Sequence, residues 1–422
     1  MLADALLTTS WQQRSMLKAA WVVFGRRARW VRPVVAEVVR AYRDAPADRP
    51  RELARFIAAI VPGTRAEGTF ARHRLVTPAR TVRMRWPAPR LDDLAALADF
   101  LAVDGDQLDW LADRREINRH ARDERLRHYR YRWLPHRLIE APKPRLRAIQ
   151  RQLLDQVLAA MPVHDRVHGF VAGRGVHTFA ASHAGQPVLV SMDLRAFFSS
   201  ITAARVYALF REAGYPEPVA HTLTALTTTR TPAHVLRAAP DATRAALLRQ
   251  PHLPQGAPTS PALANLCAFR LDRRLTGLAD RFGLHYSRYA DDLAFSGTLG
   301  PGRTQRLIAY VRTIAAEEGF RAHPDKTRVR RPGDRQLLAG LVVNSRPAVP
   351  REDYDGLRAV LHNAARDGLA DANRDGHPEF AAHLAGRVAW MAHRHPTRAA
   401  KLHGLLRAAL NLPSPSANDE DR

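Results

Sequence analysis

Apolar residues recur at helical spacing toward both ends of the chain. They lie three and four positions apart in Trp30–Tyr42 and Leu91–Leu101, and proline-containing breaks separate such segments. We therefore expect residues 1–125 to form a helical N-terminal extension. The same spacing over Arg351–Asn411 predicts further helices, and residues 412–422 are expected to be a disordered tail.

The middle of the chain carries patterns typical of strands. Leu284–Gly297 contains two short runs of β-forming residues joined by a tight turn, and Leu337–Val343 predicts one further strand. Val188, Leu189 and Val190 form a buried-strand run. An extended segment that begins at Tyr129 gives way at Pro144 to an amphipathic helix. Together these patterns predict an α+β fold.

Other segments between these strands are less regular. The pattern predicts helices over Thr202–Gly214 and Pro218–Leu226, and a third over Thr304–Gly319 with Thr304 as its N-cap. Thr227–Gln250 shows little pattern and is interpreted as a variable insertion. His168–Gly175 is rich in glycine but lacks the ending of a phosphate-binding P-loop, so we expect glycine there to permit a close backbone approach.

Three aspartates stand at the ends of the predicted strands. Asp193 follows the Val188 run, and a carboxylate there is costly to bury unless it is paired or binds a metal. Asp291 and Asp292 lie in the turn of Leu284–Gly297, where two like charges repel each other unless a cation neutralises them. Mg²⁺ prefers such oxygen ligands. A solvated turn would also explain the adjacent pair, because aspartate is common in turns.

Composition narrows the class of protein. The chain has 422 residues, 46% of them hydrophobic, which predicts two or three domains with full cores. No run approaches the length of a membrane span, and a signal peptide is not expected, so we predict a cytoplasmic protein without a membrane partner. Cys267 is the single cysteine, which excludes an internal disulfide and a cysteine zinc site.

The net charge of +24 predicts an acidic partner, and nucleic acid is the usual one. Nearly all of this charge is arginine, because the chain has only four lysines. Cations crowd the start of the helix at Pro144, namely Arg137, Lys143, Arg145 and Arg147. They could bind a triphosphate or a template backbone, or they could simply form a basic helix start.

Six stretches in order resemble the polymerase region of reverse transcriptases, and bacterial retron reverse transcriptases in particular. They are IEAPKPRLRAIQRQLL (Ile139–Leu154), VHGFVAGRG (Val167–Gly175), DLRAFFSSI (Asp193–Ile201), LPQGAPTSPALANL (Leu253–Leu266), YADDLAFSG (Tyr289–Gly297) and GLVVN (Gly340–Asn344). The resemblance covers roughly residues 128–410. It implies a right-handed polymerase, with fingers and palm over residues 126–345 and a helical thumb over residues 346–411.

The resemblance also implies roles for single residues. Asp193 and Asp291 would bridge two Mg²⁺ ions, or Mn²⁺, with Asp292 as the third carboxylate. Phe198 would lie under the incoming sugar and exclude a 2′-hydroxyl. Gln255 would contact the nucleotide, and Lys326 would protonate the leaving pyrophosphate, which an ammonium can do and a guanidinium cannot.

Basic residues complete the implied site. Arg137, Lys143 and Arg145 would bind the triphosphate. A further set is expected to contact nucleic acid, and it comprises Arg147, Arg174, Arg387, Arg394 and Arg398.

The chain departs from the family pattern in three places. The fingers hairpin is shortened to Pro135-His136-Arg137, which implies that triphosphate binding is altered or is carried by Arg137, Lys143 and Arg145. Phe179 stands where many retron enzymes have asparagine, although Ala180 and His183 of that signature are kept. Leu338-Ala339-Gly340 replaces the Val-Thr-Gly of the family.

The resemblance implies an RNA-directed DNA polymerase that adds deoxynucleotides to a hydroxyl primer. A retron enzyme would copy a structured noncoding RNA, form a branched RNA–DNA product, and act in antiphage defence with a separate effector protein. The alternatives are another bacterial reverse transcriptase, of group II intron-like or other defence-associated type, and a non-catalytic RNA-binding protein. A palm-bearing nucleotide cyclase would need a Gly-Gly-Asp or Gly-Gly-Glu hairpin, which YADD is not.

Overall fold

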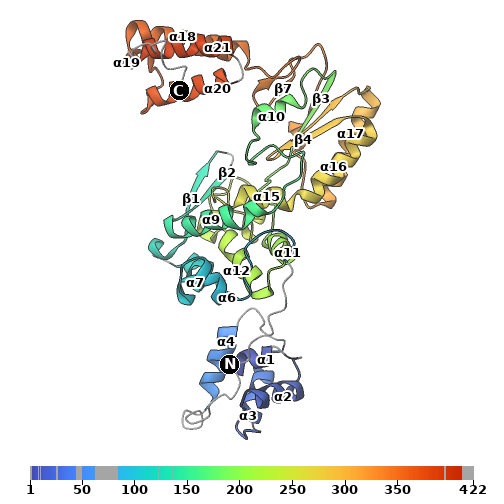
Figure 1. The fold of residues 1–422 in the computed structure, drawn as a ribbon, viewed down its shortest axis with the longest axis vertical. Helices are drawn as coiled ribbons and strands as arrows, with labels where there is room; N and C mark the ends of the chain where they lie inside the picture. The colour runs from blue at the N-terminus through green and yellow to red at the C-terminus, as the bar shows by residue number, and fades with distance from the viewer. Residues whose placement is uncertain are drawn as a thin grey trace. The chain divides into compact units, whose positions relative to one another are not determined.

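The computed structural model describes residues 2–7, 9, 11–24, 27–43, 50–61, 84–121, 123–135, 137–393 and 396–410. The chain divides into two compact units (Figure 1). The first unit comprises Met1–Pro162 and Phe198–Cys267, and the second comprises Val163–Phe197 and Ala268–Arg422. Each unit therefore contains two separate stretches of the chain.

The N-terminal helices share a core of their own. They are α1 (Leu2–Leu7), α2 (Gln13–Phe24), α3 (Val31–Ala41) and α4 (Pro50–Ile60). In α3 the valines at positions 31, 34, 35 and 38 are buried, which is the spacing of one helical face. They pack with Met16 and Leu53 from the neighbouring helices. The predicted helical character of this region is confirmed for its described residues.

Three further helices precede the first strand. They are α6 (Leu94–Phe100), α7 (Gly105–Ala112) and α8 (Ile117–His120). Asp93 and Asp104 cap α6 and α7, since each side chain accepts a hydrogen bond from the first turn of its helix. Both helices pack on α12 (Glu217–Thr227).

The rest of the first unit combines a hairpin with helices. β1 (Tyr129–Leu134) and β2 (Arg137–Pro142) pair antiparallel, and α9 (Pro144–Gln156) follows with proline in its first turn. Leu146, Ile149 and Leu153 are buried along α9, as predicted. The other helices are α11 (Ala203–Ala213), α12, α13 (Ala233–Leu236), α14 (Ala242–Arg249) and α15 (Ser260–Cys267).

Thr227–Gln250, which shows little pattern in the sequence and is interpreted as a variable insertion, contains regular structure. The segment contains α13 and α14, and the Asp241 side chain caps α14. Thr229 and His252 exchange two backbone hydrogen bonds, of 2.9 and 2.8 Å, across the base of the segment. Both helices are short, so few apolar residues repeat at helical spacing, and the backbone contact that joins the ends of the segment has no local sequence signal.

The second unit is built on a four-stranded antiparallel sheet with the order β4-β5-β3-β6. Its strands are β3 (Val188–Asp193), β4 (His285–Tyr289), β5 (Asp292–Gly297) and β6 (Arg328–Arg330). The predicted strand–turn–strand of Leu284–Gly297 is confirmed. Helix α16 (Phe269–Phe282) packs on β4 and on α17 (Pro301–Glu317), and α10 (Val176–Ala181) also contacts β4.

Side-chain contacts assign these helices to opposite faces of the sheet. Tyr286 and Arg288 of β4 hydrogen bond with Asp272 of α16, whereas Ser287 between them hydrogen bonds with His183, which follows α10. Because successive side chains of a strand alternate between faces, α16 covers one face and the α10 region covers the other.

Two predicted boundaries need correction. Helix α17 begins at Pro301 after Gly300, so Thr304 is not the N-cap; its hydroxyl donates to the Gly300 carbonyl from within the first turn. Leu337–Val343 forms two short strands, β7 (Leu337–Leu338) and β8 (Leu341–Val342), because Ala339 and Gly340 turn the chain with positive φ values of 46° and 84°.

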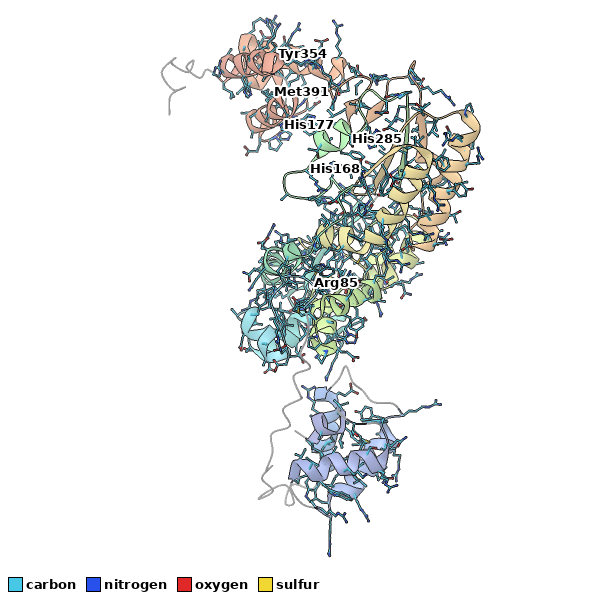
Figure 2. All side chains as sticks on the ribbon, turned by 45° about the vertical axis from the view of Figure 1, so that its right-hand side comes forward. Arg85, His168, His177, His285, Tyr354 and Met391 are labelled. Carbon is cyan, nitrogen blue, oxygen red and sulfur yellow. The ribbon has the colours of Figure 1, made fainter. Side chains whose placement is uncertain are left out.

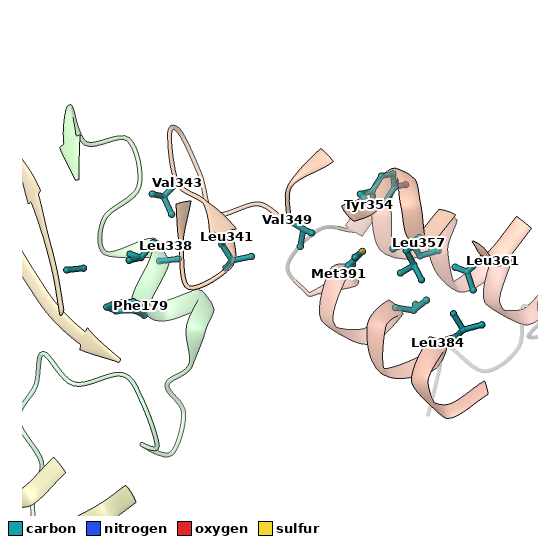
Figure 3. Close-up of a cluster of buried hydrophobic side chains, with 14 of the residues drawn as sticks. Phe179, Leu338, Leu341, Val343, Val349, Tyr354, Leu357, Leu361, Leu384 and Met391 are labelled. Atoms are coloured by element: carbon teal, nitrogen blue, oxygen red, sulfur yellow. The ribbon is translucent and has the colours of Figure 1, made fainter. Parts of the chain in front are cut away.

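The C-terminal helices are α18 (Arg351–Asp367), α19 (Leu369–Ala372), α20 (Phe380–Ala392) and α21 (Pro396–Ala409). Leu357, Leu361 and Leu384 lie between them, in a cluster that also includes Phe179 and Leu338 (Figure 3). The predicted helical character of this region is confirmed over its described residues. None of the helices that the structure describes has the length and apolar character that a membrane crossing requires.

Candidate active site

The three predicted carboxylates lie at one end of the sheet in the second unit. Asp193 ends β3 and pairs directly with Asp292, which begins β5. Directly opposed residues project from the same face, so these two side chains are neighbours. Asp291 precedes Asp292 in the turn, and its carbonyl accepts a hydrogen bond from Leu194 N at 2.9 Å. The fold thus brings together the three aspartates that the sequence suggested for one site.

Negative charge is only partly balanced at this end of the sheet. The pKa of Asp292 is raised to about 6 by burial and by the neighbouring carboxylates of Asp291 and Asp193. Lys326, in the 3-10 helix Pro324–Lys326, donates from Nζ to Asp193 Oδ2 at 3.0 Å and opposes this shift. The pKa of Asp292 stays raised despite this ammonium, so a further cation would be stabilised here.

These residues suit a divalent metal by charge and by donor atom. Carboxylate oxygens are hard ligands, and a cation would relieve the repulsion that raises the pKa of Asp292. Asp193, Asp291 and Asp292 would hold it. Among the described residues, no three acidic, histidine or cysteine side chains already lie close enough to enclose a metal ion. Lys326 pairs with Asp193 in this arrangement, so metal binding would require its exposed ammonium to move.

The first unit contains a cavity of about 320 Å³ that joins two predicted nucleotide contacts. Phe198 and Gln255 both line it, together with Arg147 and Arg151 of α9. Phe197 is buried whereas Phe198 is half-buried, so only the latter is available to a ligand. The two phenylalanines lie in a turn that follows β3.

Backbone contacts fix the loop that carries Gln255. The Gln255 carbonyl accepts a hydrogen bond from Glu140 N at 2.8 Å. Gly256 has a φ of +127°, and a Cβ there would lie 3.3 Å from the Glu140 carbonyl. Only glycine adopts this conformation readily so close to another backbone. The loop is therefore held against β2.

Two predicted cations already have partners within the protein. Lys143 Nζ donates to the carbonyl of Glu124 and, at 3.4 Å, to that of Arg125. Arg174 Nη1 donates to the carbonyls of Asp165 and Val167 at 2.8 Å each, which closes the glycine-rich loop. Both side chains thus have structural contacts in addition to the ligand contacts predicted for them.

The other predicted cations lie at or near the surface. Arg137, Arg145 and Arg147 are exposed and Arg387 is half-buried. The Arg398 guanidinium lies 4.8 Å from the Tyr354 ring centroid, as a cation–π pair. Arg394 lies outside the described residues. Arg151 of the cavity was missed, although it follows Arg147 by one helical turn, a spacing that could have indicated it.

His183 is a buried histidine in contact with both strands of the YADD hairpin, and no role was assigned to it from the sequence. His183 Nδ1 lies 2.7 Å from Ser296 Oγ, and Nε2 lies 2.7 Å from Ser287 Oγ. Burial lowers the pKa of His183 to about 3, so the ring is neutral and bridges β4 and β5. His168 lies on the loop that precedes α10 and His177 lies in α10 (Figure 2).

Comparison with known proteins agrees with this geometry. Residues 135–347 match the family model described as reverse transcriptase (RNA-dependent DNA polymerase). The retron Mx162 reverse transcriptase of Myxococcus xanthus is 40% identical over 348 residues, which cover 77% of this chain and 68% of that protein. The retron Mx65 reverse transcriptase of the same organism is 41% identical over 298 residues, or 68% of this chain and 66% of that protein.

A more distant relative comes from another organism. The retron Ec86 reverse transcriptase of Escherichia coli is 30% identical over 228 residues, which cover 54% of this chain and 65% of that protein. The chain belongs to the reverse transcriptase family of RNA-dependent DNA polymerases, and within it to the retron type.

Proposed function

We propose that this reverse transcriptase copies a structured noncoding RNA into DNA, with two divalent metal ions held by Asp193, Asp291 and Asp292. The observation that carries the metal assignment is the direct pairing of Asp193 with Asp292 beside Asp291, with the pKa of Asp292 raised to about 6. Such ions would activate the primer hydroxyl and stabilise the leaving pyrophosphate. Mg²⁺ is the expected ion, and Mn²⁺ could replace it.

The protein's own residues would position the substrates. Phe198 is proposed to lie under the deoxyribose and Gln255 to contact the nucleotide, which is supported by their shared cavity. Lys326, now paired with Asp193, is proposed to donate a proton to pyrophosphate. Arg137, Lys143 and Arg145 would contact the triphosphate, and the remaining predicted arginines would contact RNA.

The proposed domains follow the sequence prediction. Residues 126–345 would be the fingers and palm, residues 346–411 the thumb, and residues 1–125 an extension of unassigned role. The relatives are retron enzymes by name. We therefore propose a branched RNA–DNA product primed from a 2′-hydroxyl, and a role in antiphage defence with a separate effector.

Isolation of the protein from its host with its bound nucleic acid tests this proposal. A small RNA joined through a branch to DNA is expected with the natural protein. Asp291→Asn should retain the RNA without attached DNA, whereas the exposed-site control Asp280→Asn should behave as the natural protein does. An unbranched product would favour another type of reverse transcriptase, and DNA attached in Asp291→Asn would contradict the metal role.

A further inference from the structure

The turn that carries Asp291 has an unfavourable backbone conformation. Only Ala290 and Asp291 connect the paired residues Tyr289 and Asp292, and Ala290 has a φ of +53°. Alanine rarely adopts such a value, because its Cβ crowds the backbone. Ala290 is also 8% exposed, so protein surrounds it. Contacts from neighbouring residues must therefore hold this conformation.

One such contact comes from a buried arginine on β4. The Arg288 side chain is fully buried, and its Nη1 donates to the Ala290 carbonyl at 2.9 Å. Its Nε and Nη2 donate to the two carboxylate oxygens of Asp272 at 2.8 and 2.7 Å. The Tyr286 hydroxyl also donates to Asp272, at 2.8 Å. The guanidinium is thus anchored on α16 through Nε and Nη2 and contacts the strained peptide through Nη1.

The chemistry of arginine explains why this residue type fits. Its planar fork can bind both oxygens of a carboxylate and still donate to a third acceptor, which a lysine ammonium cannot do with the same geometry. A buried ion pair is a poor way to gain stability alone, because apolar residues of similar size often stabilise a core equally well. Its direct contact with the turn indicates a positioning role.

A second contact comes from Gly169 in the glycine-rich loop. A Cβ at position 169 would lie 2.6 Å from Ala290 N, closer than real Cβ atoms approach other atoms. Backbone hydrogen bonds from His168 N to the Arg288 carbonyl and from Arg288 N to the Arg166 carbonyl, both 2.8 Å, align this loop with β4. The loop backbone therefore lies directly against the turn, and the expectation of a close approach by glycine is confirmed.

We propose that the Asp272–Arg288 pair and Gly169 are positioning elements of the polymerase reaction. Together they fix the Ala290–Asp291 turn and with it the direction in which Asp291 and Asp292 present their carboxylates. This inference rests on the proposed metal role of those aspartates. Neither Arg288 nor Gly169 would touch substrate, so their loss should act on metal use and turnover rather than on nucleotide affinity.

A matched pair of glycine substitutions gives the sharpest test. Gly169→Ala forces a Cβ against Ala290, whereas a Cβ at Gly175, in the same loop, would meet nothing within 4 Å. Extension of oligo(dT) on poly(rA) would be measured with dTTP at varied Mg²⁺. For Gly169→Ala, assayed well below its own Tm, we expect kcat to fall at least tenfold and half-saturating Mg²⁺ to rise severalfold, with little change in the KM for dTTP. Gly175→Ala should match the natural protein.

Arg288→Lys tests the other contact, with Leu275→Ala as a control for lost stability. Leu275 is fully buried on the same helix as Asp272 and has no hydrogen bond to the turn. Each variant is assayed at the same number of degrees below its own Tm. Under these conditions the kcat of Arg288→Lys should fall far more than the kcat of Leu275→Ala. If kcat instead falls in proportion to the loss of Tm in both variants, the ion pair only stabilises the fold and does not position the turn.

The possible outcomes distinguish failure of the positioning role from failure of the proposed metal role. Wild-type kcat and Mg²⁺ dependence in Gly169→Ala would overturn the positioning role, whatever Arg288→Lys does. Asp291→Asn is measured in the same assay. If Asp291→Asn still extends the primer, the proposed metal role fails; if it is inactive while Gly169→Ala is unaffected, only the positioning role fails.

Discussion

Glu140 and His252 form a buried ion pair whose removal should be measurable in stability. Both side chains are 1% exposed, and His252 Nε2 lies 2.8 Å from Glu140 Oε2. Thr231 donates to the other carboxylate oxygen at 2.8 Å, and His252 Nδ1 lies 2.7 Å from the Gln250 carbonyl. Burial alone would lower the pKa of His252, but the Glu140 carboxylate raises it above its usual value. A carbonyl and a carboxylate oxygen thus face the two ring nitrogens, and the protonated imidazole can donate to both.

The expected loss follows from these contacts. Glu140→Gln keeps the shape of the side chain but turns two charge-assisted hydrogen bonds into neutral ones, each weaker by about 1 kcal/mol. The free energy of unfolding should therefore fall by about 2 kcal/mol. His252→Leu leaves the carboxylate buried without its cation, and the loss should reach about 3–5 kcal/mol. Glu212→Gln is the control: its pair with Arg85 is half-exposed in the same unit and should contribute less than about 1 kcal/mol.

The pH dependence distinguishes this pair from other causes of instability. A raised pKa in the folded protein means that the stabilisation is fully present below the unfolded pKa of about 6.5 and is lost as pH rises through the folded value. The free energies of unfolding of the natural protein and of Glu140→Gln, measured in urea, should therefore differ most below pH 6.5 and converge as the pH rises above that value.

Two results would refute this reasoning. If Glu140→Gln and Glu212→Gln lose the same free energy of unfolding, burial does not strengthen the Glu140–His252 pair. A difference between the natural protein and Glu140→Gln that stays constant with pH would show that His252 is not charged.

Three further predictions concern the reaction itself. Asp291→Asn should abolish primer extension while RNA binding persists, measured by gel extension and filter binding; retained extension would contradict its metal role. Phe198→Ala should raise ribonucleotide incorporation, seen as a smaller ratio of kcat/KM for dNTP over rNTP, and an unchanged ratio would place the sugar gate elsewhere. Affinity for single-stranded RNA should fall steeply with salt, with a log–log slope of about −0.7 for each phosphate neutralised, and a flat response would exclude a phosphate-dominated surface.

Local patterns in the sequence predicted much of the fold. The YADD hairpin was found because two short runs of β-forming residues flank a tight turn, and α9 was found because its apolar residues recur every three to four positions. The boundary of α17 was misplaced because Thr304 has the side chain of a cap, whereas Pro301 favours the first turn more strongly. The two short strands at Leu337–Val343 were merged because their left-handed turn contains alanine as well as glycine.

Contacts between distant residues could not be predicted in this way. Glu140 and His252 are 112 positions apart, and neither stands in a pattern that identifies its partner. Arg288 precedes the YADD turn by two positions, but its partner Asp272 lies on a helix that shows only amphipathic spacing. The sequence therefore indicated candidate site residues, while the long-range contacts of Glu140 and Arg288 became visible only in the structure.

The enclosed carboxylates described above fall into two groups, which differ in how their negative charge is neutralised. Asp272 and Glu140 are enclosed, and each is matched by a cation within hydrogen-bond distance, Arg288 and His252 respectively. Asp193 and Asp292 are paired across two strands beside Asp291, and burial and these neighbouring carboxylates raise the pKa of Asp292 to about 6 although Lys326 pairs with Asp193. A raised carboxyl pKa means that the charged form is unfavourable at this place in the fold. A bound divalent cation would reverse that preference, which is the physical reason to expect metal ions here.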